Sequence, residues 1–216
     1  LPIVALVGTN NLSTAIIILG IAVIVVFVSD KRYMQFVWIA AAGAGMMALF
    51  LGMESYRLER IAIWKNPEAY EKGYQTIQGL YAIGSGGLFG KGFGESIQKL
   101  GFVPEAQNDM IFSIICEELG FVGATILMLV FLMLIWRFMV IAVHAPDLFG
   151  SLIAAGAMGH IAIQVILNVA VVTNTIPNTG ITLPFISYGG TSVLFLLSEM
   201  GLVLAVSRWQ SEKKCI

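Results

Sequence analysis

The sequence has little charge. Lys, Arg, Asp and Glu make up 12% of its 216 residues, whereas hydrophobic residues make up 58%, and the mean hydropathy is +0.88. A soluble domain of this size has no way to hide so much apolar surface from water. The composition therefore excludes a soluble globular protein and indicates an integral membrane protein. The net charge of −1 carries no message about charged partners. No nucleic acid is expected as a partner.

Cysteines and nucleotide-binding motifs are also scarce. Cys116 and Cys215 lie far apart without metal-ligand spacing, so neither a disulfide nor a zinc or redox site is predicted. Residues 84–94 are rich in glycine but contain no GxGxxG, and a P-loop would need Gly in place of Ser85 and Ser or Thr in place of Gly92. The run fits either a re-entrant turn at the membrane surface or a close approach of the backbone to a ligand. No organic cofactor is expected.

The apolar stretches lack the polar–apolar alternation of barrel strands, so they are predicted to be helices. A spanning helix needs roughly 20 predominantly apolar residues. Five stretches qualify: residues 12–28, 33–53, 110–136, 149–172 and 190–207. Residues 1–8 are too short to cross and are predicted to be the stump of a preceding helix, which suggests the C-terminal portion of a longer protein. Residues 1–216 are thus expected to form one all-α membrane domain, a polytopic helix bundle.

The basic residues in the short connections predict the orientation. They follow the first, third and fifth predicted spans, as Lys31, Arg32, Arg137, Arg208, Lys213 and Lys214. These positions share one side of the membrane if the helices alternate, so that side and the C-terminus are predicted to be cytoplasmic. Residues 54–109 then form a large extracytoplasmic loop. Residues 173–189 form an outer re-entrant turn, which is expected to fold back toward Asp109.

A single acid, Asp109, stands where this loop turns into the third predicted span. An acid at a helix start is often no more than a favourable partner for the helix dipole. Here Ser113 and Glu117 follow at four-residue spacing and extend a polar stripe along the predicted helix. Carboxylates inside a membrane are costly and are seldom kept without a partner. Both a structural and a working role therefore remain open for Asp109.

A second polar stripe lies in the fourth predicted span, where His160, Gln164 and Asn168 recur at the same spacing. Polar side chains in membrane bundles more often form interhelical hydrogen bonds than a transport path, so this stripe is predicted to be structural. Glu199 in the last span is a further buried acid for which the sequence indicates no partner.

Three segments occur in the order GYQTIQGLYAIGSGGLFGKGFG, PEAQNDMIF to EELGFVG, and NTGITLPFISYGGTS. Together they closely resemble the SEDS family (shape, elongation, division and sporulation), which includes FtsW, RodA and SpoVE. The connection HAPDLFGS is more similar to the FtsW and SpoVE branch. The resemblance implies about ten membrane helices, of which this chain holds the last five. It also implies a peptidoglycan glycosyltransferase that polymerises lipid II, for division or sporulation, in the bacterial cytoplasmic membrane.

The family's essential aspartate aligns with Asp109, although Asn108 and Met110 replace the usual Thr and Phe beside it. The resemblance implies that Asp109 is the catalytic base of an inverting transfer with an undecaprenyl pyrophosphate leaving group. Positive side chains suit the pyrophosphate, with Mg²⁺ or Mn²⁺ as a cofactor. The expected substrate-binding residues are Arg57, Arg60, Lys91, Glu105, Gln107, Ser187 and Tyr188.

The resemblance implies further partners as well. These are a class B penicillin-binding protein, which is a transpeptidase, and other membrane proteins of division or sporulation. Two other classes of function remain open on the sequence. A lipid II flippase would need the polar stripes to line a continuous path, and a non-catalytic scaffold of the division machinery would need neither the stripes nor Asp109.

Overall fold

The computed structural model describes residues 4, 6–8, 11–29, 34, 37–38, 41–43, 45 and 55–214, without the side chains of residues 12, 55–58 and 211–214. All regular elements within these ranges are helices. The chain forms two compact units. One comprises Leu1–Phe50, Leu132–Ile163 and Gly190–Ile216, and the other comprises Leu51–Phe131 and Gln164–Gly189. The predicted span 33–53 lies mostly outside the described residues.

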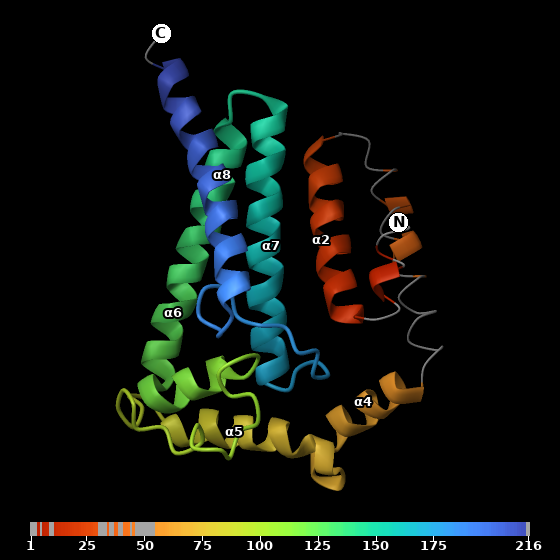
Figure 1. The fold of residues 1–216 in the computed structure, drawn as a ribbon, viewed down its shortest axis with the longest axis vertical. Coiled ribbons are helices and arrows are strands. Elements are labelled where there is room, and N and C mark those ends of the chain that lie inside the picture. The colour runs from red at the N-terminus through yellow and green to blue at the C-terminus, as the bar shows by residue number, and fades with distance from the viewer. Residues whose placement is uncertain are drawn as a thin grey trace. The chain divides into compact units, whose positions relative to one another are not determined.

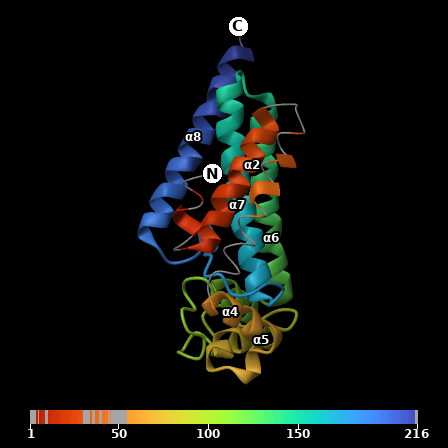
Figure 2. The same ribbon diagram turned by 90° about the vertical axis from the view of Figure 1, so that its right-hand side faces the viewer.

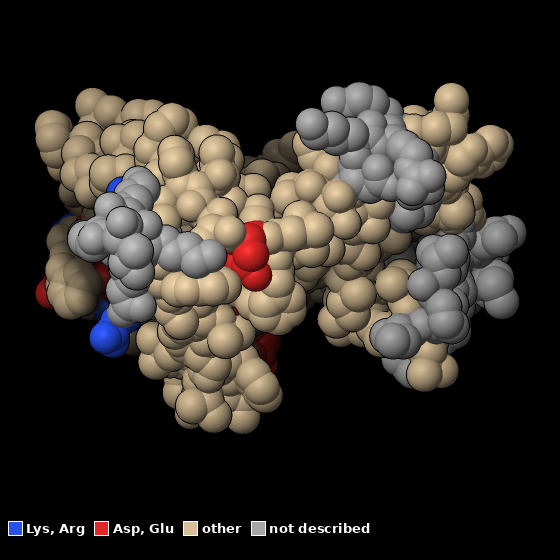
Figure 3. Space-filling view, turned by 90° about the horizontal axis from the view of Figure 1, so that it is seen from above, with Lys and Arg blue, Asp and Glu red and all other residues tan. Residues whose placement is uncertain are grey.

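Among the described residues, three helices are long and apolar enough to cross a membrane: α6 (Ile111–His144), α7 (Leu148–Val172) and α8 (Gly190–Lys214), the last over Gly190–Gln210. They coincide with three of the predicted spans, and α2 (Leu12–Ser29) coincides with a fourth. The described apolar part of α2, Ser13–Ser29, is slightly shorter than a full span. The all-α membrane fold is therefore confirmed. Figure 3 looks at the molecule from above the view of Figure 1, and Lys, Arg, Asp and Glu occupy only small areas of the described surface on that side.

In the first unit, α2 lies beside α7 (Figure 1, Figure 2). Small residues allow this contact: a Cβ added to Gly20 would lie 2.5 Å from Cδ1 of Ile163, and one added to Gly159 would lie 2.5 Å from Cδ1 of Ile24. Glycine at a helix interface lets backbones approach closely, which is how helices associate in lipid, where no hydrophobic force drives them together.

The same unit contains a hydrogen-bonded pair of side chains between α7 and α8. His160 Nδ1 lies 2.8 Å from Glu199 Oε2. The predicted interhelical role of the second stripe is thus confirmed at His160, and the partner of Glu199 is His160, which the sequence could not indicate. Gln164, the next member of the stripe, lies half-buried on α7.

In the second unit, four helices lie in the predicted loop 54–109. They are α4 (Ser55–Lys65), the 3₁₀ turns η1 (Pro67–Ala69) and η2 (Glu71–Gly73), and α5 (Tyr74–Gly86). The helix α4 contains Arg57 and Arg60. The rest is more ordered than expected because α5 buries a face of small residues, Gly79, Ala82 and Gly86. A Cβ on Gly86 would lie 2.0 Å from the carbonyl oxygen of Cys116, so α5 packs closely on the start of α6.

The helix α6 is interrupted at Gly120, whose φ of 68° and ψ of −170° are not helical. Figure 1 shows α6 turning there into a new direction. The segment 87–92 supplies the missing partners through four backbone hydrogen bonds: Lys91 N to Glu117 O (2.9 Å), Gly92 N to Glu118 O (3.0 Å), Phe121 N to Gly87 O (2.9 Å) and Val122 N to Leu88 O (3.1 Å). Backbone groups near a membrane must be satisfied by the protein, and this segment satisfies them.

The glycines of the segment 87–92 allow its backbone to approach α6 closely. Gly90 has a φ of 77°, and a Cβ there would lie 2.1 Å from the carbonyl oxygen of Glu118. A Cβ on Gly120 itself would lie 2.3 Å from the backbone nitrogen of Gly90. The glycines at these positions therefore bring the backbone against the chain's own helix α6.

Candidate active site around Asp109

Asp109 lies in the turn before α6 and is buried, with 9% of its surface exposed. Gln75, near the start of α5, donates from Nε2 to Asp109 Oδ1 at 3.3 Å and to Pro104 O at 3.3 Å. The side-chain oxygen of Gln75 accepts a hydrogen bond from Asn178 Nδ2 at 3.2 Å. Gln75 thus joins the Asp109 carboxylate to the outer turn 173–189.

Asn168 of α7 fixes the backbone at Asp109. Its side chain is fully buried, and Nδ2 donates to Asp109 O at 2.8 Å and to Ile181 O at 2.7 Å. A buried amide with two backbone acceptors is a strong local constraint. The predicted structural role of Asn168 is therefore to hold the outer turn and the Asp109 turn together.

The outer turn folds back onto the Asp109 segment, as expected. Ser187 Oγ donates to Asn108 O at 2.6 Å and accepts from Leu183 N at 2.7 Å. Tyr188 N donates to Gln107 O at 2.8 Å, whereas the Tyr188 side chain is exposed. These contacts give Ser187 and the backbone of Tyr188 a positioning role beside Asp109.

A cavity of about 270 Å³ opens beside Asp109. The other polar side chains of its lining are Arg60, Lys72, Gln75, Thr76, Asn174 and Asn178. Arg60 Nη1 donates to Asn178 O at 3.1 Å, and Trp64 Nε1, also in the lining, donates to Asn174 O at 2.9 Å. The cavity therefore combines one carboxylate with two positive charges and several amides.

Burial raises the pKa of Asp109 above its ordinary value, and the nearby charge of Glu105 adds to that increase. Hydrogen bonds from the backbone of Asp109 and from Gln75 act in the opposite direction. A carboxylate with a raised pKa is a better proton acceptor than a fully solvated one. Positive charge in the same cavity comes from Arg60 and from Lys72, which also pairs with Glu59 at 3.0 Å.

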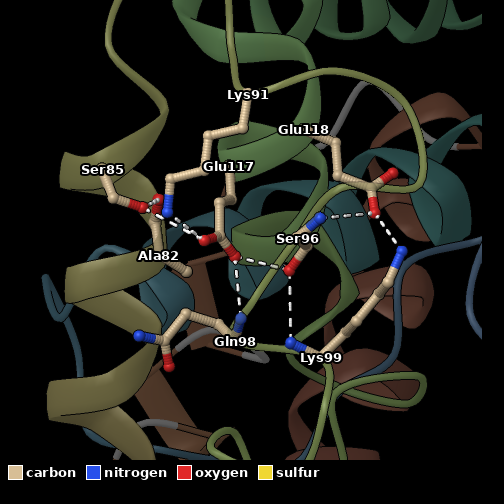
Figure 4. A network of polar contacts seen from close by, with 8 residues as sticks. All are labelled: Ala82, Ser85, Lys91, Ser96, Gln98, Lys99, Glu117 and Glu118. Atoms are coloured by element: carbon tan, nitrogen blue, oxygen red, sulfur yellow. Dashed lines mark hydrogen bonds and ion pairs between the residues drawn. The ribbon is translucent and has the colours of Figure 1, made fainter.

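Lys91 lies elsewhere. Its Nζ is 2.6 Å from Glu117 Oε1, and Lys91 is not among the residues that line the Asp109 cavity. Glu117 is completely buried and also accepts hydrogen bonds from Ser85, Ser96 and the backbone of Gln98 (Figure 4). The partner of the Glu117 carboxylate is therefore Lys91. The structure does not bring Lys91 together with Asp109.

The cavity beside Asp109 is not lined by Glu105, Gln107 or Ser113, which were also predicted. Glu105, at a φ of 52°, accepts a hydrogen bond from Asn108 and lines a second cavity of about 520 Å³ together with Gln107. Ser113, buried in the first turn of α6, donates to Met110 O at 2.7 Å. The side chain of Arg57 lies outside the described residues.

Several residues of the cavity were not predicted, among them Gln75, Lys72 and Asn178. Gln75 could have been predicted, because it lies in the first family segment as a polar residue at the start of an otherwise apolar helix. Lys72 and Asn178 offered no local signal. Their place in the cavity depends on contacts between distant parts of the chain.

A divalent cation in this cavity would have to take most of its ligands from a substrate. Among the described residues, no three His, Cys, Asp or Glu side chains cluster as a ready-made metal site. The cavity offers the single carboxylate of Asp109, with amide oxygens nearby. Mg²⁺ in phosphate-transfer sites is commonly held by one or two carboxylates, with substrate phosphates and water as the other ligands.

Comparison with known proteins identifies the family. A family model described as "Cell cycle protein", which covers FtsW, RodA and SpoVE, matches residues 1–212. The chain belongs to this family. Membership in the FtsW/RodA/SpoVE family, together with its apolar helices, makes it a multi-pass membrane protein. The resemblance noted in the sequence is thus confirmed.

Relatives in the FtsW/RodA/SpoVE family are similar over nearly the whole chain. It is 46% identical over 202 residues to stage V sporulation protein E of Bacillus subtilis, covering 92% of this chain and 55% of that protein. It is 41% identical over 204 residues to a probable peptidoglycan glycosyltransferase FtsW of Trichlorobacter lovleyi, covering 91% and 52%. The chain therefore spans about half the length of these relatives.

Two solved structures share the fold. A chain in a peptidoglycan synthase complex is 31% identical with a TM-score of 0.75, and the match covers 96% of this chain and 59% of that one. A mutant of the rod shape determining protein RodA of Thermus thermophilus is 30% identical with a TM-score of 0.63, and the match covers 96% and 54%. Both support the all-helical membrane fold.

Proposed function

We propose that this chain forms about half of a peptidoglycan glycosyltransferase that polymerises lipid II into glycan strands, in cell division or sporulation. The relatives named FtsW are described as probable peptidoglycan glycosyltransferases, and a related chain is part of a peptidoglycan synthase complex. The observation that carries the proposal is the buried carboxylate of Asp109, which shares a cavity with Arg60 and Lys72.

Asp109 acts as the general base. The 4-hydroxyl oxygen of the acceptor GlcNAc bonds to the anomeric carbon of the donor MurNAc, and its proton passes to the Asp109 carboxylate. The bond from that carbon to the pyrophosphate breaks, and undecaprenyl pyrophosphate leaves with the bonding electrons. Attack from the face opposite the leaving group inverts the configuration. The raised pKa of Asp109 favours proton uptake at this step.

The cations of the cavity bind the leaving pyrophosphate. Arg60 can pair with phosphate oxygens through two parallel hydrogen bonds, and Lys72 adds a mobile point charge. Mg²⁺ or Mn²⁺ bound at the cavity would neutralise further charge on the pyrophosphate. Gln75 and Asn168 orient Asp109 through its carboxylate and its backbone.

The proposal places the cavity at the outer surface of the bacterial cytoplasmic membrane. The basic residues of the short connections support a cytoplasmic C-terminus. Residues 54–109 and 173–189, which form the cavity, then lie outside, where lipid II is consumed. The synthase complex containing a related chain supports a partner that crosslinks strands, a class B penicillin-binding protein. Other division or sporulation membrane proteins complete the expected set of partners.

Glycan-strand formation from purified lipid II tests the proposal. The full-length protein with its transpeptidase partner is compared with Asp109→Asn, which keeps size and hydrogen bonding but removes basicity, and with Glu68→Gln, an exposed acid outside the cavity. Wild type and Glu68→Gln are expected to form product, whereas Asp109→Asn loses at least about 100-fold of the rate. Equal product from all three would refute Asp109 as the base. Product from none would favour a flippase or a scaffold.

A further inference from the structure

The loop 87–102 carries an exposed apolar surface. Its large apolar residues are Leu88, Phe89, Phe93, Ile97, Leu100 and Phe102, all exposed, and Phe89 and Phe93 reach 81% and 88%. This segment lies outside the membrane-crossing helices, where an apolar surface of this kind marks a site that contacts protein or membrane.

Backbone hydrogen bonds join the loop 87–102 to α6, and they fix the depth of the loop in the membrane. Backbone hydrogen bonds connect Leu88 to Val122 and Gly87 to Phe121, the first residues after the break at Gly120. Between that break and Arg137, α6 is apolar but extends only about 24 Å at roughly 1.5 Å per residue. The hydrocarbon core is about 30 Å thick. Phe121 and Val122, both exposed, therefore lie at or inside its boundary, and Leu88 lies beside them.

The basic charges of the loop are each paired with an acid of α6. Lys91 pairs with the buried Glu117 at 2.6 Å, and Lys99 pairs with Glu118 at 2.7 Å (Figure 4). Paired charges enter a membrane boundary at far lower cost than free ones. The other charged residue of the loop, Glu95, is exposed, which suits a side chain among lipid headgroups.

From these contacts we infer that the loop 87–102 is a membrane-interface element, whose apolar side chains insert into the headgroup and acyl boundary of the outer leaflet. Apolar side chains that enter this boundary bind by burying their area there. The occupant of the apolar surface is therefore lipid, continuous with the lipid around α6. The inference does not depend on the proposed catalytic activity.

Spin labels on the full-length protein in lipid nanodiscs test the depth of the loop. Single cysteines replace Phe89 or Phe93 in a background without other reactive cysteines, and Glu68→Cys in η1 is the matched exposed control. Relaxation by oxygen, which concentrates in the bilayer, is compared with relaxation by a water-soluble nickel complex. At positions 89 and 93 oxygen is expected to exceed the nickel complex several-fold, with the reverse at position 68.

Two results would overturn the inference. Access of the nickel complex to 89 and 93 equal to that at 68 would place the loop in water. Protection of 89 and 93 from both reagents would show that protein covers the surface, either the rest of the full-length chain or a partner. The measurement reports the depth of the loop in the bilayer, so its outcome is independent of whether the protein polymerises lipid II.

Discussion

The side-chain amide of Gln75 lies 3.3 Å from Oδ1 of Asp109, and the same amide accepts a hydrogen bond from Asn178. One residue of α5 thus connects the carboxylate to the outer turn. A displacement of α5 or of the turn is expected to reach Asp109 through Gln75.

Replacing Gln75 is expected to shift the pH dependence of polymerisation. The hydrogen bond from Gln75 lowers the pKa of Asp109, so Gln75→Leu raises that pKa further. The acidic limb of the rate profile then moves to higher pH, and the loss of rate is greatest at low pH. Gln78→Leu, in the same helix but outside the cavity lining, is the control. Identical profiles for the two variants would contradict this role for Gln75.

Asp109→Asn is expected to stabilise the protein at neutral pH although it inactivates it. Because burial raises the pKa of Asp109, the folded state binds the proton more tightly than the unfolded chain. The cost of the buried charge is absent below the ordinary carboxylate pKa of about 3.9 and grows as the pH rises through the folded-state pKa. Thermal unfolding in detergent should show a gain for Asp109→Asn at pH 7 that shrinks toward pH 4.5. A loss of stability for Asp109→Asn at pH 7 would refute the predicted stabilisation.

Arg60→Ala is expected to weaken binding of the pyrophosphate-bearing substrate. Charge-assisted hydrogen bonds contribute roughly 1.5–3 kcal/mol, so the apparent KM for lipid II should rise about tenfold or more. Lys65→Ala removes an exposed cation from the same helix, outside the cavity lining, and should leave KM unchanged. Similar KM values for both variants would remove Arg60 from the binding site.

Gly86→Ala is expected to lower the stability of the protein, whereas Gly84→Ala is expected to raise it. A Cβ at Gly86 meets the carbonyl oxygen of Cys116 at 2.0 Å, whereas a Cβ at Gly84 meets nothing within 4 Å. Overpacking costs roughly 1–3 kcal/mol, while Ala in place of a free helical Gly gains up to about 1 kcal/mol. Thermal unfolding of the two variants measures the difference. Equal stability would show that α5 does not pack closely on α6.

The His160–Glu199 pair is expected to couple α7 to α8. The two groups are 2.8 Å apart, and polar pairs between membrane helices contribute about 0.6 kcal/mol on average and up to about 1.7. A double-mutant cycle with His160→Phe and Glu199→Gln, followed by unfolding in detergent, measures the coupling energy. Additive effects would mean that the contact contributes nothing to the packing of these helices.

The membrane helices could be predicted because length and apolarity suffice to identify them, and α6, α7 and α8 each coincide with a predicted span. The helix α5 was harder to predict, since its helical state rests on packing against α6 and its sequence is rich in glycine. Its small-residue face is visible only once the partner helix is known. The break at Gly120 was likewise hidden, because the apolar run continues on its far side.

The site could be predicted only in part. Asp109 stood out as an acid at a helix boundary, and the outer turn was expected to return to it. The pairing of Lys91 with Glu117 spans 26 positions, and that of Gln75 with Asn178 spans 103, and a single sequence contains no signal for either distance. Lys91 therefore looked like a loop cation available to a substrate, and the role of Gln75 was missed.

The bridge across the break in α6 has a consequence for how this protein can change. Its four bonds use backbone atoms alone, so the side chains of Leu88 and Phe89 can be exchanged without altering them. An inserted or deleted residue between Gly87 and Gly92 would instead shift the donors at one end of the bridge relative to the acceptors at the other. The backbone groups at the break in α6 would then lose their hydrogen-bond partners beside lipid. Apart from its glycines, this segment is therefore constrained in length more than in composition.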